Sequence, residues 1–183
     1  MRNLTRLASI AAAIALGAMG SAAQAGSLIG SKVTGTLYNP DLQTILGGPT
    51  TAIVGASSPT FPNGSILGNS AFQINITSDQ LVYSPLANVT YGGGTFNGFV
   101  FEFANAPLIT SVTLDASSNF TPFAISFTGN SISLNLRTNT VNTSSVAVLD
   151  IQTLSTPVPE PKAWLMALLG LTFIGGLARR RAA

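Results

Sequence analysis

The stretch FAISFTGNSISLNLR, residues 123–137, decides the fold of this chain. Apolar side chains occupy every second position on both sides of a Gly129-Asn130 pair: Phe123, Ile125 and Phe127 before it, and Ile132, Leu134 and Leu136 after it. A period of two places successive side chains on opposite faces of a strand. Two such runs around a short turn predict a β-hairpin with one apolar face and one polar face.

The same period recurs between residues 26 and 155, and no part of that segment has a convincing helical period. Further strands are predicted at Lys32–Tyr38, Thr51–Gly55, Ala71–Thr77, Gln80–Tyr83, Thr95–Phe103, Ile109–Asp115 and Ser145–Leu154. Short strands separated by glycine, proline and asparagine favour an all-β fold, a single antiparallel β-sandwich of about seven to nine strands. A barrel is the structural alternative. Two stretches are interpreted as loops: Gly47–Asn69, with room for one edge strand, and Gly92–Gly94.

Residues 1–25 have the three parts of a secretory signal peptide. Arg2 and Arg6 precede an apolar run at residues 7–19, and the small-residue pattern Ala23-Gln24-Ala25 follows. Cleavage after Ala25 would make Gly26 the first residue of the exported protein. We therefore expect the Sec translocon and signal peptidase as partners during export, and one β-domain, the body, at residues 26–155.

The last segment, residues 156–183, contains an apolar run at residues 163–178. As a helix this run would span roughly 24 Å, slightly less than a hydrocarbon core of about 30 Å. A tryptophan at its start and arginines at its end can extend it to both interfaces, and its glycines are tolerated in a membrane. These residues are Trp164, Gly170, Gly175, Gly176, Arg179, Arg180 and Arg181. We expect one transmembrane helix with the arginines in the cytoplasm and the body on the other side.

A proline-rich strip precedes this helix. Pro157, Pro159 and Pro161 fix φ at alternate positions and push the residues between them towards extended geometry. We expect an exposed, polyproline-like strip that a protease or transpeptidase cleft can grip. Glu160 is the one charge between Thr156 and Pro161, so it is the natural handle for recognition.

The complete tail resembles the PEP-CTERM sorting signal of Gram-negative bacteria. The residues that carry the resemblance are Val158-Pro159-Glu160-Pro161, Trp164, the glycine-interrupted apolar run and Arg179-Arg180-Arg181. The resemblance implies handling by an exosortase, a membrane cysteine transpeptidase, in a bacterium that makes exopolysaccharide. It implies a transient precursor in the inner membrane with its body on the periplasmic side, and then a protein on the cell surface or in the extracellular matrix. The same signature is also labelled as the C-terminal region of ice-binding proteins, but the body shows no ice-binding repeat.

The composition of the body argues against catalysis. The chain has no histidine and no cysteine, which removes the usual general base, the thiol nucleophile, disulfides and most zinc ligand sets. Between residues 26 and 158 there are two basic residues, Lys32 and Arg137, and five acidic ones, for a net charge of −3. That balance leaves no basic face for nucleic acid. Lys32 is interpreted as a solvated charge on an edge strand, and no cofactor or metal is expected.

The first hypothesis is therefore an exported, non-catalytic surface or matrix protein that acts with exopolysaccharide in a biofilm. A carbohydrate-binding module is the alternative, and Tyr91, beside the glycine loop, is its best candidate for an exposed sugar-stacking ring. A polysaccharide hydrolase that uses Glu102 or Asp115 is the second alternative, because paired carboxylates can hydrolyse glycosides.

Overall fold

The computed structural model describes residues 26–66 and 71–154, which form one compact unit. Every regular element in these two ranges is a β-strand, and every strand pairing is antiparallel. The all-β prediction is therefore confirmed. Within the same two ranges, no helix has the length and hydropathy needed for a membrane crossing.

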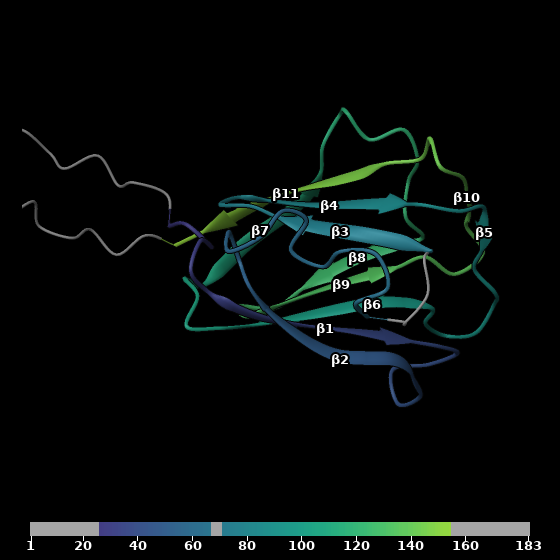
Figure 1. Ribbon diagram of the computed structural model, residues 1–183, viewed down its shortest axis with the longest axis horizontal. Coiled ribbons are helices and arrows are strands. Elements are labelled where there is room, and N and C mark those ends of the chain that lie inside the picture. Colours follow the sequence, from purple (N-terminus) through teal and green to yellow (C-terminus); the bar gives the residue numbers. More distant parts are fainter. Residues whose placement is uncertain (1–25, 67–70, 155–183) are drawn as a thin grey trace, which may run out of the picture. The chain divides into compact units, whose positions relative to one another are not determined.

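Eleven strands form three sheets in this part of the chain (Figure 1). The five-stranded sheet has the order β2 (Ile45–Ile53), β1 (Lys32–Tyr38), β6 (Gly98–Ala104), β9 (Ser131–Asn135) and β8 (Ala124–Phe127). The four-stranded sheet has the order β3 (Phe72–Ile76), β4 (Gln80–Pro85), β11 (Ala147–Thr153) and β7 (Ile109–Leu114). A short two-stranded sheet joins β10 (Thr140–Val141) to β5 (Val89–Thr90).

The predicted strands all exist, although their bounds differ by a few residues. β1 spans the predicted Lys32–Tyr38, and β2 begins at Ile45, six residues before the predicted start at Thr51. Ile45 and Leu46 precede the stretch interpreted as a loop, and the rest of β2 lies in it as the one edge strand for which the prediction left room. Pro49 is compatible with this strand because β2 is at a sheet edge, where a missing N–H removes no ladder bond. β5 and β10 were not predicted, because two residues are too few for a period to appear.

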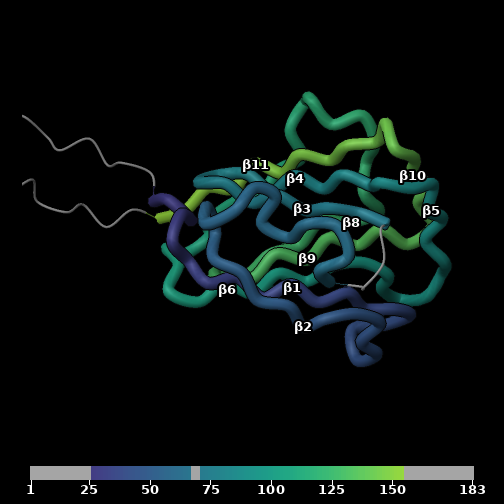
Figure 2. Tube along the Cα trace, viewed as in Figure 1, coloured from purple at the N-terminus to yellow at the C-terminus, as the bar shows by residue number. Residues whose placement is uncertain are grey.

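Aromatic side chains between the two larger sheets form the centre of the core. Phe99 of β6 is fully buried, and its ring centroid lies 4.6 Å from that of Phe72 in β3 and 5.7 Å from that of Tyr83 in β4. Figures 1 and 2 show β3 and β4 in one layer and β1, β2 and β6 in the other. Burial of one such side chain contributes about 1.5–3 kcal/mol, so these contacts hold the two sheets face to face.

The hairpin predicted at residues 123–137 is present, but its two strands are not buried alike. Ile132 and Leu134 of β9 are fully buried, as predicted, while Phe127 at the end of β8 is 42% exposed. β8 is the edge strand of its sheet, so core side chains cover its apolar face from one side only. Lys32 was interpreted as a solvated charge on an edge strand. Its side chain is exposed, but the edge position is wrong, because β1 lies between β2 and β6.

Both ends of the described chain meet at one end of the body. Thr153 Oγ1 donates a hydrogen bond to the Gly26 carbonyl oxygen (2.6 Å), and the Leu154 N–H donates to the Leu108 carbonyl (2.8 Å). We call this end, marked by Gly26, Leu108 and Leu154, the proximal end. The other end, marked by the Tyr38–Gly98 pair of β1 and β6, is the distal end. Seven residues of β1 separate the two ends by about 20 Å.

Candidate functional site

The loop between β5 and β6, residues 91–97, is held in place by neighbouring segments at the distal end. The N–H groups of Thr95 and Phe96 both donate to the Pro40 carbonyl oxygen, at 3.0 and 3.1 Å. The Asn135 side chain accepts from the Asn97 N–H at 3.1 Å and donates to the Thr95 carbonyl at 3.4 Å. An amide side chain can donate and accept at once, so one residue fixes the loop from both sides. We call residues 91–97 the distal loop.

Two neighbouring glycines of the distal loop have opposite surroundings. Gly94 has φ +115°, and a Cβ at this position would overlap the Pro40 carbonyl oxygen. Only glycine adopts that backbone conformation without strain. A Cβ on Gly93 would meet nothing within 4 Å. The sequence pattern marked the triple glycine as a flexible loop, whereas the structure requires glycine at position 94 for a close approach to Pro40.

Arg137 forms a second clamp on this loop. Its Nη1 donates to the Gly94 carbonyl oxygen at 2.9 Å, and its guanidinium carbon lies 3.7 Å from the centroid of the Phe123 ring. Cations over an aromatic face contribute about 0.5–1 kcal/mol at exposed sites. The Nε atom is buried and has no hydrogen-bond partner among the described residues. Arg137 therefore acts here through its planar shape as well as its charge.

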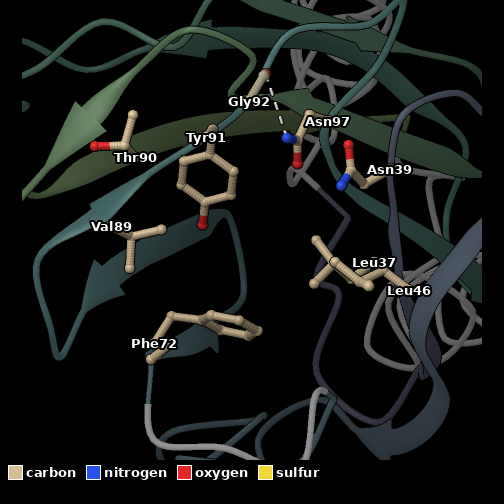
Figure 3. A pocket seen from close by; sticks show the side chains of 10 residues that line it. Leu37, Asn39, Leu46, Phe72, Val89, Thr90, Tyr91, Gly92 and Asn97 are labelled. Carbon is tan, nitrogen blue, oxygen red and sulfur yellow. Dashed lines mark hydrogen bonds between the residues drawn. The ribbon is translucent and has the colours of Figure 1, made fainter.

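A small pocket of about 180 Å³ lies beside the distal loop (Figure 3). Its apolar lining includes Leu37, Phe72 and Val89, and its polar lining includes Asn39, Thr90 and Asn97. Figure 3 places the amides of Asn39 and Asn97 on the same side of the pocket. No lining residue within the described ranges carries a charge. We call this site the distal pocket.

Tyr91 lines the distal pocket, but it is not the exposed ring that the sequence predicted. It is 7% exposed, and its hydroxyl lies 2.7 Å from the hydroxyl of Tyr83 in a buried hydrogen bond. Its main chain bonds to the 138–139 segment, with Tyr91 N–H to Asn139 O at 2.9 Å and Thr138 N–H to Tyr91 O at 3.1 Å. This pairing turns the ring inward, so the prediction of an exposed stacking platform is wrong.

Burial also changes the acidity of the two tyrosines. It raises the pKa of Tyr83 to about 12, because the charged phenolate loses its hydration inside the protein. Burial raises the pKa of Tyr91 further above its ordinary value, and the nearby Tyr83 adds to the shift. Both hydroxyls therefore stay protonated near neutral pH and act as hydrogen-bonding groups.

The two acids named for a hydrolase do not come together. Glu102 lies exposed on β6 of the five-stranded sheet, while Asp115 follows β7 of the four-stranded sheet. The Asp115 carboxylate accepts from the Ser117 side chain and from the Ser117 N–H (2.8 Å), and these bonds lower its pKa. A general acid for glycoside cleavage needs a raised pKa instead. No group of three acidic, histidine or cysteine side chains suitable for a metal occurs in residues 26–66 and 71–154.

The residues of the two terminal signals lie outside the described ranges. These are the cleavage-site residues Ala23 and Ala25, the sorting motif Val158-Pro159-Glu160-Pro161, and the anchor residues from Trp164 to Arg181. Gly26 alone is described, at the proximal end beside Thr153. Three comparisons bear on the whole chain: no family model, no curated protein and no solved structure matches it.

Proposed function

We propose that this chain is an exported, non-catalytic surface or matrix protein that an exosortase sorts through a PEP-CTERM signal at residues 156–183. The observation that carries the proposal is the order of parts in that segment: Val158-Pro159-Glu160-Pro161, an apolar run, and Arg179-Arg180-Arg181. The signal peptide at residues 1–25 would deliver the body to the periplasmic side of the inner membrane. Cleavage near the proline motif would then release it to the surface or the exopolysaccharide matrix.

The body suits such display. We propose that it is a single antiparallel β-sandwich attached through its proximal end. Thr153 and Gly26 bond to each other there, so a tether that leaves after Leu154 starts about 20 Å from the distal pocket. Tethering at that end would leave the distal loop and the distal pocket free to meet other molecules.

Processing of the tail tests the sorting proposal. We replace Pro159, Glu160 and Pro161 with alanine in an exosortase-bearing host and determine both ends of the mature protein by mass spectrometry. The expected result is a membrane-held form that keeps its apolar run, while Pro157→Ala, which leaves the motif intact, is processed like the parent. Normal removal of the tail from the triple-alanine variant would show that this motif is not the signal.

A carbohydrate-binding role of the body is the second candidate, and one observation favours it. The distal pocket combines apolar walls with the amide side chains of Asn39 and Asn97 and contains no charged residue. Sites for uncharged, hydroxyl-rich ligands need this mixture, because apolar surface covers the ring and a few polar groups fix its orientation. A sorted matrix protein and a saccharide-binding body are compatible, since they use different parts of the chain.

A further inference from the structure

We propose that the distal pocket binds a single uncharged sugar ring, the terminal unit of a saccharide chain, end-on. The inference rests on the carbohydrate-binding candidate and specifies its site and ligand class. It replaces the flat stacking platform expected from sequence with a half-open pocket in which Tyr91 forms a wall. It is independent of the sorting signal, which lies outside the described residues.

The volume of the distal pocket suits one sugar ring. It holds about 180 Å³. About 10–15 Å³ of such volume is enough to hold one water, so the pocket has room for several waters. Pockets for drug-sized ligands are larger, about 300–1,000 Å³. One sugar ring can displace this water, but a second ring would remain outside.

The walls of the pocket match the two kinds of surface on a sugar. The rings of Phe72 and Tyr91 and the side chain of Val89 offer apolar contact for the C–H faces. Tyr91 can serve in this way because its hydroxyl is already bonded to Tyr83, which fixes the ring and leaves no polar group unsatisfied.

The amide side chains supply the hydrogen bonds. Asn97 Nδ2 donates to the Gly92 carbonyl at 3.3 Å, which fixes the amide and leaves its Oδ1 to accept from a sugar hydroxyl. The Asn39 side chain is half-buried and has no hydrogen-bond partner within the described part of the chain. It can both donate and accept, as a hydroxyl group requires. Removal of the Asn39 side chain should therefore weaken ligand binding without removing a hydrogen bond of the fold.

The absence of charge in the lining selects against acidic sugars. None of the described residues that line the distal pocket is ionised, and residues 26–158 carry a net charge of −3. A carboxylate brought into such a site would lose hydration without gaining a cationic partner. Neutral hexoses should therefore bind better than the corresponding uronic acids.

The test uses the full-length chain in a detergent without a sugar headgroup. Saturation-transfer NMR is recorded with methyl glycosides of glucose, galactose, mannose and N-acetylglucosamine, and with galacturonate as the charged match of galactose. We expect at least one neutral sugar to bind with a dissociation constant of about 1 mM, in the range of weak, small-ligand association. Galacturonate should bind at least about tenfold more weakly.

Two variants with matched controls test whether the sugar binds in the distal pocket. Asn39→Ala removes the free amide and should weaken binding at least about fivefold, the usual effect of one lost hydrogen bond. Val89→Phe fills the pocket and should abolish binding. The controls are Asn88→Ala, an exposed amide next to Val89, and Val148→Phe, on the outer face of β11. Both should bind sugar like the parent.

Several results would overturn the inference. They are equal binding by Asn39→Ala and the parent, undiminished binding by a folded Val89→Phe, galacturonate binding as tight as galactose, or no saturation transfer from any of the sugars. Thermal unfolding of each variant shows whether it is folded, and Asn39→Ala keeps the test decisive where Val89→Phe is not. Loss of sugar binding with a normally processed tail would refute this site and leave the sorting proposal standing.

Discussion

The two ends of the body differ in which side chains hold them together. Main-chain bonds occur at both ends, as from the Leu154 N–H to the Leu108 carbonyl at the proximal end and from the Thr95 N–H to the Pro40 carbonyl at the distal end. The proximal end adds the side-chain bond from Thr153 to Gly26, and exposed aliphatic side chains such as Leu108 and Leu154 lie around it. At the distal end, the side chains of Asn135 and Arg137 fix the distal loop. Main-chain bonds survive most substitutions, whereas side-chain clamps depend on residue identity. The difference indicates that the distal loop depends on the identity of two polar side chains, Asn135 and Arg137.

The largest effect should come from the core that joins the two ends. Phe99→Ala removes a fully buried ring between the two larger sheets. We expect a loss of about 3–5 kcal/mol in the free energy of unfolding, because the cavity adds to the lost transfer energy. Urea denaturation measures it, with Phe127→Ala, 42% exposed at the β8 edge, as the matched control. Similar losses in both variants would mean that Phe99 contributes no more to stability than an edge residue does, against its complete burial.

The next test sets two adjacent glycines of the distal loop against each other. Gly94→Ala combines a positive φ with an overlap at the Pro40 carbonyl, and we expect a loss of about 1–3 kcal/mol in unfolding free energy. Gly93→Ala has open space around the new methyl group and should change stability by about 0.5 kcal/mol or less. Chemical denaturation of both variants supplies the comparison. Equal values would show that the distal loop is not fixed at Gly94.

The strands could be predicted because their signal is local. The alternation of Ile132, Leu134 and Leu136 is visible in the sequence, and these three side chains are fully buried. Edge position was harder, since sheet order depends on contacts between distant segments. The sequence cannot show that β8 ends its sheet, and so Phe127 was expected in the core. The start of β2 was predicted six residues too late for a related reason. A proline such as Pro49 ends an interior strand but is tolerated at a sheet edge.

The distal pocket could be predicted only in part. The triple glycine marked the right loop and drew attention to Tyr91, which does line the pocket. The inward turn of its ring depends on the bond to Tyr83 and the pairing with residues 138–139, neither of which has a sequence signature. Asn39 comes from the β1–β2 connection, far away in the sequence. One clue was available for Arg137, which is the single arginine between residues 26 and 158.

Alkaline pH should destabilise the fold through Tyr83 and Tyr91, whose hydrogen bond joins the core to the distal loop. The folded pKa of Tyr83, about 12, lies above its ordinary value of 10. The fold therefore favours the neutral phenol. This contribution to stability is complete below pH 10 and is lost as the pH rises towards about 12. We expect the unfolding free energy to fall across that window, with phenolate absorbance rising together with unfolding.

The Tyr91→Phe variant is the control for this pH dependence. It removes one of the two titrating groups and should flatten the alkaline decline, at the cost of leaving the buried Tyr83 hydroxyl without its partner. At neutral pH we expect that orphaned hydroxyl to lower stability by about 1–3 kcal/mol. The titration is recorded in a Tyr38→Phe background, because Tyr38 is the third tyrosine of the chain. Phenolate absorbance that appears there at ordinary pH values before any unfolding would show that the pair is accessible to water.

The smallest effect should come from substitution of Arg137. The loss in unfolding free energy shows whether its side chain stabilises the distal loop. Arg137→Gln removes the contact with Phe123 and the bond to the Gly94 carbonyl, but it also removes a buried Nε that has no partner. These changes oppose each other, so we expect a net loss of only about 0.5–1 kcal/mol in unfolding free energy. Lys32→Gln, at an exposed residue of the proximal end, is the matched control and should leave stability within about 0.5 kcal/mol.

A second substitution, Arg137→Lys, shows which property of the Arg137 side chain stabilises the distal loop. If Arg137→Lys restores the stability that Arg137→Gln loses, the positive charge alone holds the distal loop. We expect it to restore only part, because a lysine ammonium lacks the planar face that stacks on Phe123. A loss in Arg137→Gln as large as that in Gly94→Ala would make the side-chain clamp as important as the glycine that it holds. No loss at all would leave Asn135 as the contact that distinguishes the distal end from the proximal one.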